Sequence, residues 1–146
     1  MATARRIVEQ HQADMVEASR TAPAAVPGEG DSVERAIELI SGSLMLAAGQ
    51  HRARYLAVFE LRLESLRQPA LAAVIDELTA AMATFTVGHH TELGLRMPPA
   101  AIPPMLVMYG GALFALVTGP AEAVTPAAVR PLATAIVKGG LAAARA

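Results

Sequence analysis

Residues 51–73, HRARYLAVFELRLESLRQPALAA, decide the fold, because they join an amphipathic helix to a second helix that begins at a proline. At about 3.6 residues per turn, the acidic side chains of the first helix gather opposite a mostly apolar stripe. The stripe consists of Tyr55, Phe59, Arg62 and Leu66. Burying an unpaired guanidinium is costly, so Arg62 must meet an acid, a carbonyl, water or a polar ligand. An internal salt bridge is slightly favoured over a ligand contact.

Length and composition indicate one folded domain over residues 1–146. Hydrophobic residues make up 53% of the chain and charged residues 17%, which is too apolar for a disordered segment and sufficient for a core. The net charge is −1 and the basic residues are scattered, so the chain lacks the electrostatic footprint that a phosphate backbone requires. We therefore do not expect this surface to hold DNA directly.

The sequence favours a cytoplasmic protein. It has no cysteine, which excludes a disulfide framework, a thiol nucleophile and a cysteine-based zinc site. The opening residues, MATARRIVEQHQ, lack the apolar run of a secretion signal. The most apolar run, MLVMYGGALFALVTG at residues 105–119, is shorter than the roughly 20 residues that a membrane-spanning helix needs. We therefore expect no membrane span and interpret this run as a core or interface helix.

Apolar residues recur at helical spacing in six segments, and none of the chain predicts a strand, so the expected class is all-α. Asp31 with Glu34 resembles a capping box, and Thr125 can cap the last helix. Gly49 and Gly94 are stop signals. The predicted helices cover about residues 3–20, 31–48, 51–67, 69–93, 103–118 and 126–141. The fifth is apolar on nearly every side, which is typical of an element covered all round.

Four stretches of the chain carry a family resemblance. The most specific is ARYLAVFELRLESLRQPAL at residues 53–71, with an aromatic start, an acidic and leucine-rich middle and a proline-marked turn. The others are RRIVEQHQADM at residues 5–15, YGGALFALVTGP at residues 109–120, and the closing segment at residues 126–141. Together they resemble the C-terminal, effector-binding and dimerising domain of the tetracycline-repressor (TetR) family of transcriptional regulators. The resemblance implies a six-helix orthogonal bundle.

The resemblance also implies a function: a small-molecule-sensing, dimerising regulatory domain of a repressor, with residues 1–20 similar to the family's connecting helix. Family members carry a helix-turn-helix head before that helix, and this chain begins where the head would have ended. We therefore expect contact with DNA only through a missing N-terminal domain. Two alternatives stay open: a headless dimer that sequesters relatives, and a small helical enzyme that acts on a hydrophobic organic acid.

A pocket enclosed by the middle helices follows from the resemblance, with a hydrophobic small molecule as its expected effector. Apolar walls with a few polar groups are usual for such sites, and methionines let the walls adapt. The candidate lining residues are Tyr55, Phe59, Arg62, Phe85, His89, Met105, Met108 and Tyr109. Aromatic and methionine side chains at helical spacing also suit a plain core, so this alternative stays open for each residue.

Small residues in the fifth helix predict a close contact between helices. Interior glycine costs about 1 kcal/mol relative to alanine, so a contact that only small residues permit should offset it. A twofold dimer through the last two helices would supply such a contact, and packing against the fourth helix is the alternative within one chain. The predicted interface consists of Gly110, Gly111, Phe114, Ala115, Val129, Leu132 and Ile136.

Signals for catalysis or metal binding are weak. His89, His90 and Glu92 form the only cluster that resembles metal ligands, yet adjacent helical residues point about 100° apart, so we expect no metal. We find no nucleophile with a base and an orienting acid, and no phosphate-binding loop. We therefore expect neither an enzyme nor a cofactor. The enzyme alternative would depend on Arg62, His89 and Tyr55 around a bound organic acid.

Overall fold

The computed structural model describes residues 29–145, together with residues 6, 9, 10, 12, 13, 16, 17 and 20. The predicted helix over residues 3–20 therefore lies largely outside the described residues, although its described positions are helical. The side chain of Asp31, expected to cap the next helix, also lies outside them.

The described part of the chain is all-α, as predicted, and contains no strand. Its helices are α2 (Glu29–Ala48), α3 (Arg52–Ser65), α4 (Pro69–Glu92), α5 (Ile102–Thr118) and α6 (Pro126–Ala143), with short 3₁₀ turns η1 (Pro99–Ala101) and η2 (Ala121–Ala123). The sequence predicted six helices, and the structure gives the bounds of five α-helices within the described residues. The bounds of all five lie close to the predicted ones.

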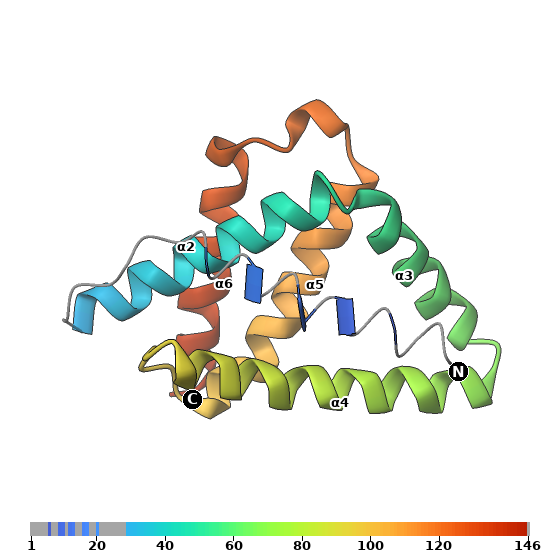
Figure 1. Cartoon of the computed structure of the whole chain (residues 1–146), viewed down its shortest axis with the longest axis horizontal. Coiled ribbons are helices and arrows are strands. Elements are labelled where there is room, and N and C mark those ends of the chain that lie inside the picture. The colour runs from blue at the N-terminus through green and yellow to red at the C-terminus, as the bar shows by residue number, and fades with distance from the viewer. Residues whose placement is uncertain are drawn as a thin grey trace.

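The helices form a bundle in which neighbours cross steeply. Figure 1 shows α5 and α6 running side by side, with α2 crossing them on one side and α4 lying along another edge. The most extensive contacts join α2 to α6 and α5 to α6, and α3 contacts both α4 and α5. This arrangement leaves α2, α4 and α5 around a shared interior space.

Local signals in the sequence set the helix ends. Pro69 occupies the first position of α4 after an extended residue, because its missing N–H is not needed there. Gly94 ends α4 with a φ of 69°, which glycine adopts without strain. The next N–H, of Leu95, donates to the carbonyl of His90 at 2.9 Å, which completes a Schellman motif. At α6, the Thr125 hydroxyl accepts from the Ala128 N–H at 3.3 Å.

The core lies where α2, α5 and α6 meet. Its most completely buried large side chains are Leu44, Ile102, Val117, Val129 and Val137. Burying side chains of this size contributes about 1.5–3 kcal/mol each, so this contact is the main source of stability. The surface ion pairs of Arg130 on α6 with Glu34 and Glu38 on α2 add little by comparison, because solvent screens them.

The closest approach between helices occurs at two adjacent glycines of α6. A Cβ at Gly140 would overlap the Met105 side chain and lie 2.9 Å from the Ala101 carbonyl oxygen, and one at Gly139 would lie 2.9 Å from Met108 Sδ. Gly110 and Gly111 of α5, which were expected to serve such a contact, have open space around an added Cβ. Within this chain, the glycines that permit close packing therefore lie on α6 rather than on α5.

Two predicted burial patterns are wrong. Arg62 and Leu66 were placed on the buried face of α3, yet Arg62 is exposed and Leu66 is 82% exposed. Figure 1 shows that the end of α3 lies at an outer corner, where the chain turns into α4. The helix α5 was expected to be covered all round, but Val107 is 77% exposed. Its neighbours cover one side only.

Two helical segments, Pro69–Glu92 and Pro99–Thr118, are long and apolar enough to cross a membrane by length and composition alone. The second is longer than the apolar run expected from the sequence, because η1 leads directly into α5. Core helices of soluble proteins pass the same test, and α5 supplies Ile102, Met105, Leu113 and Val117 to the core.

Candidate functional site

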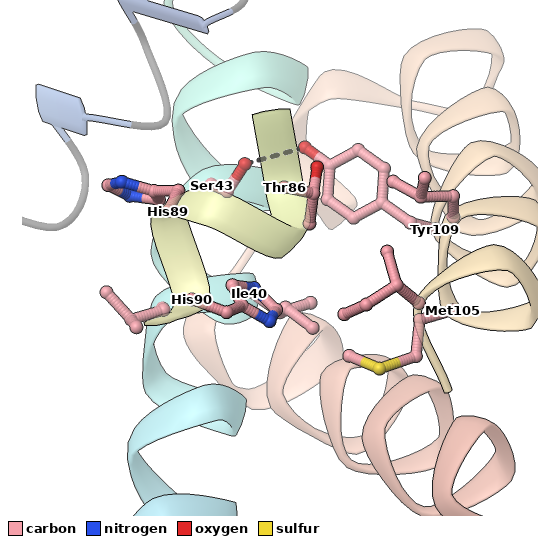
Figure 2. Close-up of a pocket in the computed structure, with 10 residues that line it drawn as sticks. Ile40, Ser43, Thr86, His89, His90, Met105 and Tyr109 are labelled. Carbon is pink, nitrogen blue, oxygen red and sulfur yellow. Dashed lines mark hydrogen bonds between the residues drawn. The ribbon is translucent and has the colours of Figure 1, made fainter. Parts of the chain in front are cut away.

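A cavity lies between α2, α4 and α5 (Figure 2). The centre of a water-sized sphere can occupy a volume of about 60 Å³ inside the cavity. The cavity together with its open mouth has a volume of about 600 Å³. Half of the lining side chains are apolar and half carry a polar atom. The lining residues are Leu39, Ile40 and Ser43 of α2, Thr86, His89 and His90 of α4, and Ile102, Met105, Leu106 and Tyr109 of α5.

The hydroxyl groups of the cavity already have partners. Ser43 Oγ and Tyr109 Oη lie 2.7 Å apart in a hydrogen bond that joins α2 to α5, drawn as a dashed line in Figure 2. Thr86 donates back to the carbonyl of Met82 at 2.8 Å, one turn earlier in α4. Paired hydroxyls of this kind fix the walls of the cavity without placing a charge there.

His90 is the unsatisfied polar group of the site. Its side chain is 8% exposed, and Nδ1 is buried without a hydrogen-bond partner among the described residues. Burial lowers the pKa of His90 to about 4, with a smaller contribution from the charge of neighbouring His89. The imidazole is therefore neutral near pH 7, and it presents a buried nitrogen that lacks a partner.

His89 and His90 point in different directions, as expected for neighbours on a helix. Figure 2 shows the His90 ring on the side of the α4 ribbon that faces Ile40 and Met105, while His89 lies on the other side of that ribbon. The ring of His89 stacks on Phe85, with 5.5 Å between centroids and an angle of 13°. No group of three potential metal ligands occurs anywhere in the part of the chain that the structure describes.

Comparison with known families agrees with this architecture. The family model described as "Tetracyclin repressor-like, C-terminal domain" matches residues 31–139. The chain belongs to this tetracycline repressor-like family. Its members are parts of transcription regulators, and such domains typically dimerise and bind small-molecule ligands. Comparisons with curated proteins and with solved structures give no significant match.

In this tetracycline repressor-like domain, three of the predicted pocket residues line the cavity: His89, Met105 and Tyr109. The other five lie elsewhere. Tyr55 is buried in the core, Phe59 packs edge-to-face on Phe114, Arg62 is exposed, Phe85 stacks on His89, and Met108 packs near Gly139. The three residues of the enzyme alternative therefore do not meet at this cavity.

Sequence reasoning missed seven of the lining residues. They are Leu39, Ile40, Ser43, Thr86, His90, Ile102 and Leu106. Those of α2 were missed because the resemblance implied a pocket enclosed by the middle helices, and the candidate residues came only from helices after α2. His90 carried one detectable signal, because it is a polar residue beside His89 in a largely apolar helix. The other residues look like ordinary core in the sequence.

The predicted interface residues divide into two groups in this tetracycline repressor-like fold. Gly111, Phe114 and Ala115 lie on the exposed side of α5, and Gly110 is half-buried. On α6, in contrast, Val129 and Ile136 are buried in the chain's own core and Leu132 is half-buried. Val129 and Ile136 therefore have almost no surface left for a second copy. The exposed residues of α6 are Pro126, Ala127, Ala128, Arg130, Pro131, Ala135, Lys138, Ala142 and Ala143.

Proposed function

We propose that this chain is a small-molecule-sensing and dimerising regulatory domain, and that the cavity between α2, α4 and α5 binds a hydrophobic effector. The observation that carries the proposal is a hollow with apolar walls and a few polar groups, inside a domain of a ligand-binding family. Met105 at the wall can adapt its shape to a ligand.

The placement of α5 supports a regulatory role for this cavity. Met105, Leu106 and Tyr109 face the cavity, whereas Val107 and Gly111 lie on the opposite, exposed side of the same helix. A ligand that displaces α5 would therefore change the outer face as well. Such a displacement acts by shifting populations between two packings of the helices rather than by catalysis.

Filling the cavity tests the ligand site. We expect the neutral apolar dye N-phenyl-1-naphthylamine to bind with enhanced fluorescence, and Leu106→Trp to weaken it about tenfold or more because the indole occupies the hollow. Leu66→Trp is the matched control, since Leu66 is 82% exposed and lies outside the cavity. Equal binding to both variants would contradict the proposed site.

The outer sides of α5 and α6 support a homodimer. Val107 is 77% exposed, and Phe114 is 46% exposed although it packs on Phe59 of α3, so α5 keeps an apolar face that the described elements cover only in part. Gly111 lies on this face with open space around an added Cβ, so a second helix could approach closely there. Small residues on the exposed side of α6 would permit the same approach.

A single charge on this face tests the dimer. We expect light scattering to give the mass of a dimer for the unchanged chain and of a monomer for Val107→Glu, because a carboxylate buried at the interface would lack a partner. Leu66→Glu introduces the same charge at another exposed apolar position and should leave the dimer intact. A dimer that persists in Val107→Glu would place the interface elsewhere.

In a complete regulator of this family, this domain would act in the cytoplasm and would reach DNA only through a separate N-terminal domain. Its net charge of −1 supports that division of roles, since phosphate contacts need clustered basic residues. A gel-shift assay with the isolated chain should show no retardation of duplex DNA at physiological salt. Sequence-specific retardation would overturn this part of the proposal.

A further inference from the structure

We infer that the cavity takes an uncharged, largely apolar molecule whose single hydroxyl group meets the imidazole of His90. This inference rests on the proposed function, because it names the chemical class of the effector for the same cavity. It is carried by a buried imidazole nitrogen of the lining that has no hydrogen-bond partner, and by the charges that the lining lacks.

The lining offers no fixed charge to an ionic ligand. None of the ten lining residues is an aspartate, glutamate, lysine or arginine, and its titratable side chains are His89, His90 and Tyr109. Burial holds the pKa of His90 far below its usual value, so the imidazole remains neutral near pH 7. A carboxylate or ammonium group would lose its hydration here without gaining an opposite charge.

The lining does offer an imidazole, that of His90, which can form a hydrogen bond. The hydroxyls of Ser43 and Tyr109 pair with each other, and the hydroxyl of Thr86 donates to a carbonyl of its own helix. Nδ1 of His90 remains, buried and unpaired, on a side chain that is more than nine-tenths buried. A polar atom left in this state is costly, and a ligand group that satisfies it recovers that free energy.

A hydroxyl fits this nitrogen better than a pure donor or a pure acceptor. Neutral imidazole has two tautomers, and Nδ1 donates in one and accepts in the other. An alcohol or phenol can pair with either form, whereas an ether or a ketone can pair with only one. The apolar residues around the ring, such as Ile40 and Met105, would enclose the rest of the molecule (Figure 2).

A set of four compounds on one scaffold tests the inference at pH 7.5: 4-propylphenol, propylbenzene, 4-propylbenzoate and 4-propylbenzylammonium. Binding is followed at the Met105 methyl group by NMR. We expect 4-propylphenol to bind about fivefold more tightly than propylbenzene, as one net hydrogen bond predicts. The carboxylate and the ammonium should show no saturable binding over the same range.

Substitutions assign the preference to His90. We expect His90→Leu to bind both neutral compounds with similar affinity, and His90→Asn to retain the preference because its amide keeps a hydrogen-bonding atom near Nδ1. The matched control is His51→Leu, which removes a histidine in the turn between α2 and α3, outside the cavity. This control should leave the fivefold preference unchanged.

The outcomes separate this inference from the proposed function. If the carboxylate or the ammonium binds most tightly at Met105, the effector is ionic and the inference is wrong, while the ligand site stands. Equal binding of 4-propylphenol and propylbenzene would remove the role of His90. If N-phenyl-1-naphthylamine binds and none of the four compounds does, the inferred chemistry is wrong. If neither the dye nor any compound binds, the proposed function falls as well.

Discussion

His90 links the stability of this chain to pH. Its pKa is lowered to about 4 in the folded state by burial, whereas an unfolded histidine titrates near its ordinary value of 6.5. Between these values the unfolded chain binds a proton that the folded chain does not, so stability falls as pH falls. We expect a loss of up to about 2 kcal/mol between pH 7 and pH 5, measured by urea unfolding.

The variant His90→Asn isolates this contribution, because it keeps a polar side chain and removes the titration. Its unfolding free energy should decrease less over the same pH range than that of the unchanged chain. His89 and the other ionisable groups are present in both proteins and cancel in the comparison. Equal pH dependence in the two proteins would show that His90 titrates normally in the folded state.

The surroundings of the glycines differ, and this difference predicts that Gly→Ala substitutions at two positions change stability in opposite directions. Gly140→Ala would drive a methyl group into Met105 and against the Ala101 carbonyl, and overpacking of this kind costs about 1–3 kcal/mol. Gly88→Ala places the same group in open space inside α4 and should stabilise the helix by about 0.5–1 kcal/mol. Thermal unfolding measures the change in stability of both variants. Stability changes of the same sign would contradict the close packing at Gly140.

Single residues were only partly predictable from the sequence. The polar character of His89 and the aromatic character of Tyr109 marked them as candidates, and both line the cavity. Arg62 was marked by the same reasoning, but it is exposed because its helix turns outward at that point. Periodicity shows which residues share a face, and it does not show whether a neighbouring element covers the whole length of that face.

The ends of the helices were the most predictable elements, because their signals are local. Pro69, Gly94 and Thr125 act within one turn of their own position, and each lies at the expected boundary. The end of α5 is held differently. Arg52, at the start of α3, donates to the carbonyl oxygens of Leu116 and Gly119. Nothing local in the sequence predicts a contact between residues so far apart.

This remote cap predicts the effect of Arg52→Ala. Removing the guanidinium leaves the last carbonyls of α5 without a charged donor, and hydrogen bonds to charged groups contribute about 1.5–3 kcal/mol when buried. Arg52 is half-buried, so we expect a loss of about 1–2 kcal/mol in urea unfolding. Arg67→Ala is the control, because Arg67 forms an exposed pair with Glu64 and should change stability little. Equal losses would mean that the cap contributes nothing.

The cavity is a property of the whole arrangement, which explains why the sequence predicted it poorly. Its walls come from three helices, and α2 is distant in the chain from α4 and α5. The packing of α2 against α6 determines which residues of α2 line the cavity. A residue such as Ile40 looks like plain core in the sequence. Only the crossing of α2, α4 and α5 places it on the wall of the cavity (Figure 2).

The same arrangement separates the ligand site from the proposed dimer face. The ten residues that line the cavity lie on α2, α4 and α5 of this chain. The exposed face of α5, which includes Val107 and Phe114, lies on the opposite side of the helix from Met105 and Tyr109. Ligand binding should therefore survive the loss of the dimer, although α5 connects the two surfaces mechanically.

We expect Val107→Glu, as a monomer, to bind 4-propylphenol within about threefold of the unchanged dimer, since a shift of that size corresponds to less than about 1 kcal/mol of coupling. Calorimetric titration of both proteins measures it, with dimeric Leu66→Glu as the charge-matched control. A larger weakening confined to Val107→Glu would mean that dimerisation favours the ligand-competent position of α5, and a complete loss would mean that the partner copy supplies part of the site. By reciprocity, any coupling found in this way must also appear as a change of the dimer dissociation constant when ligand is added.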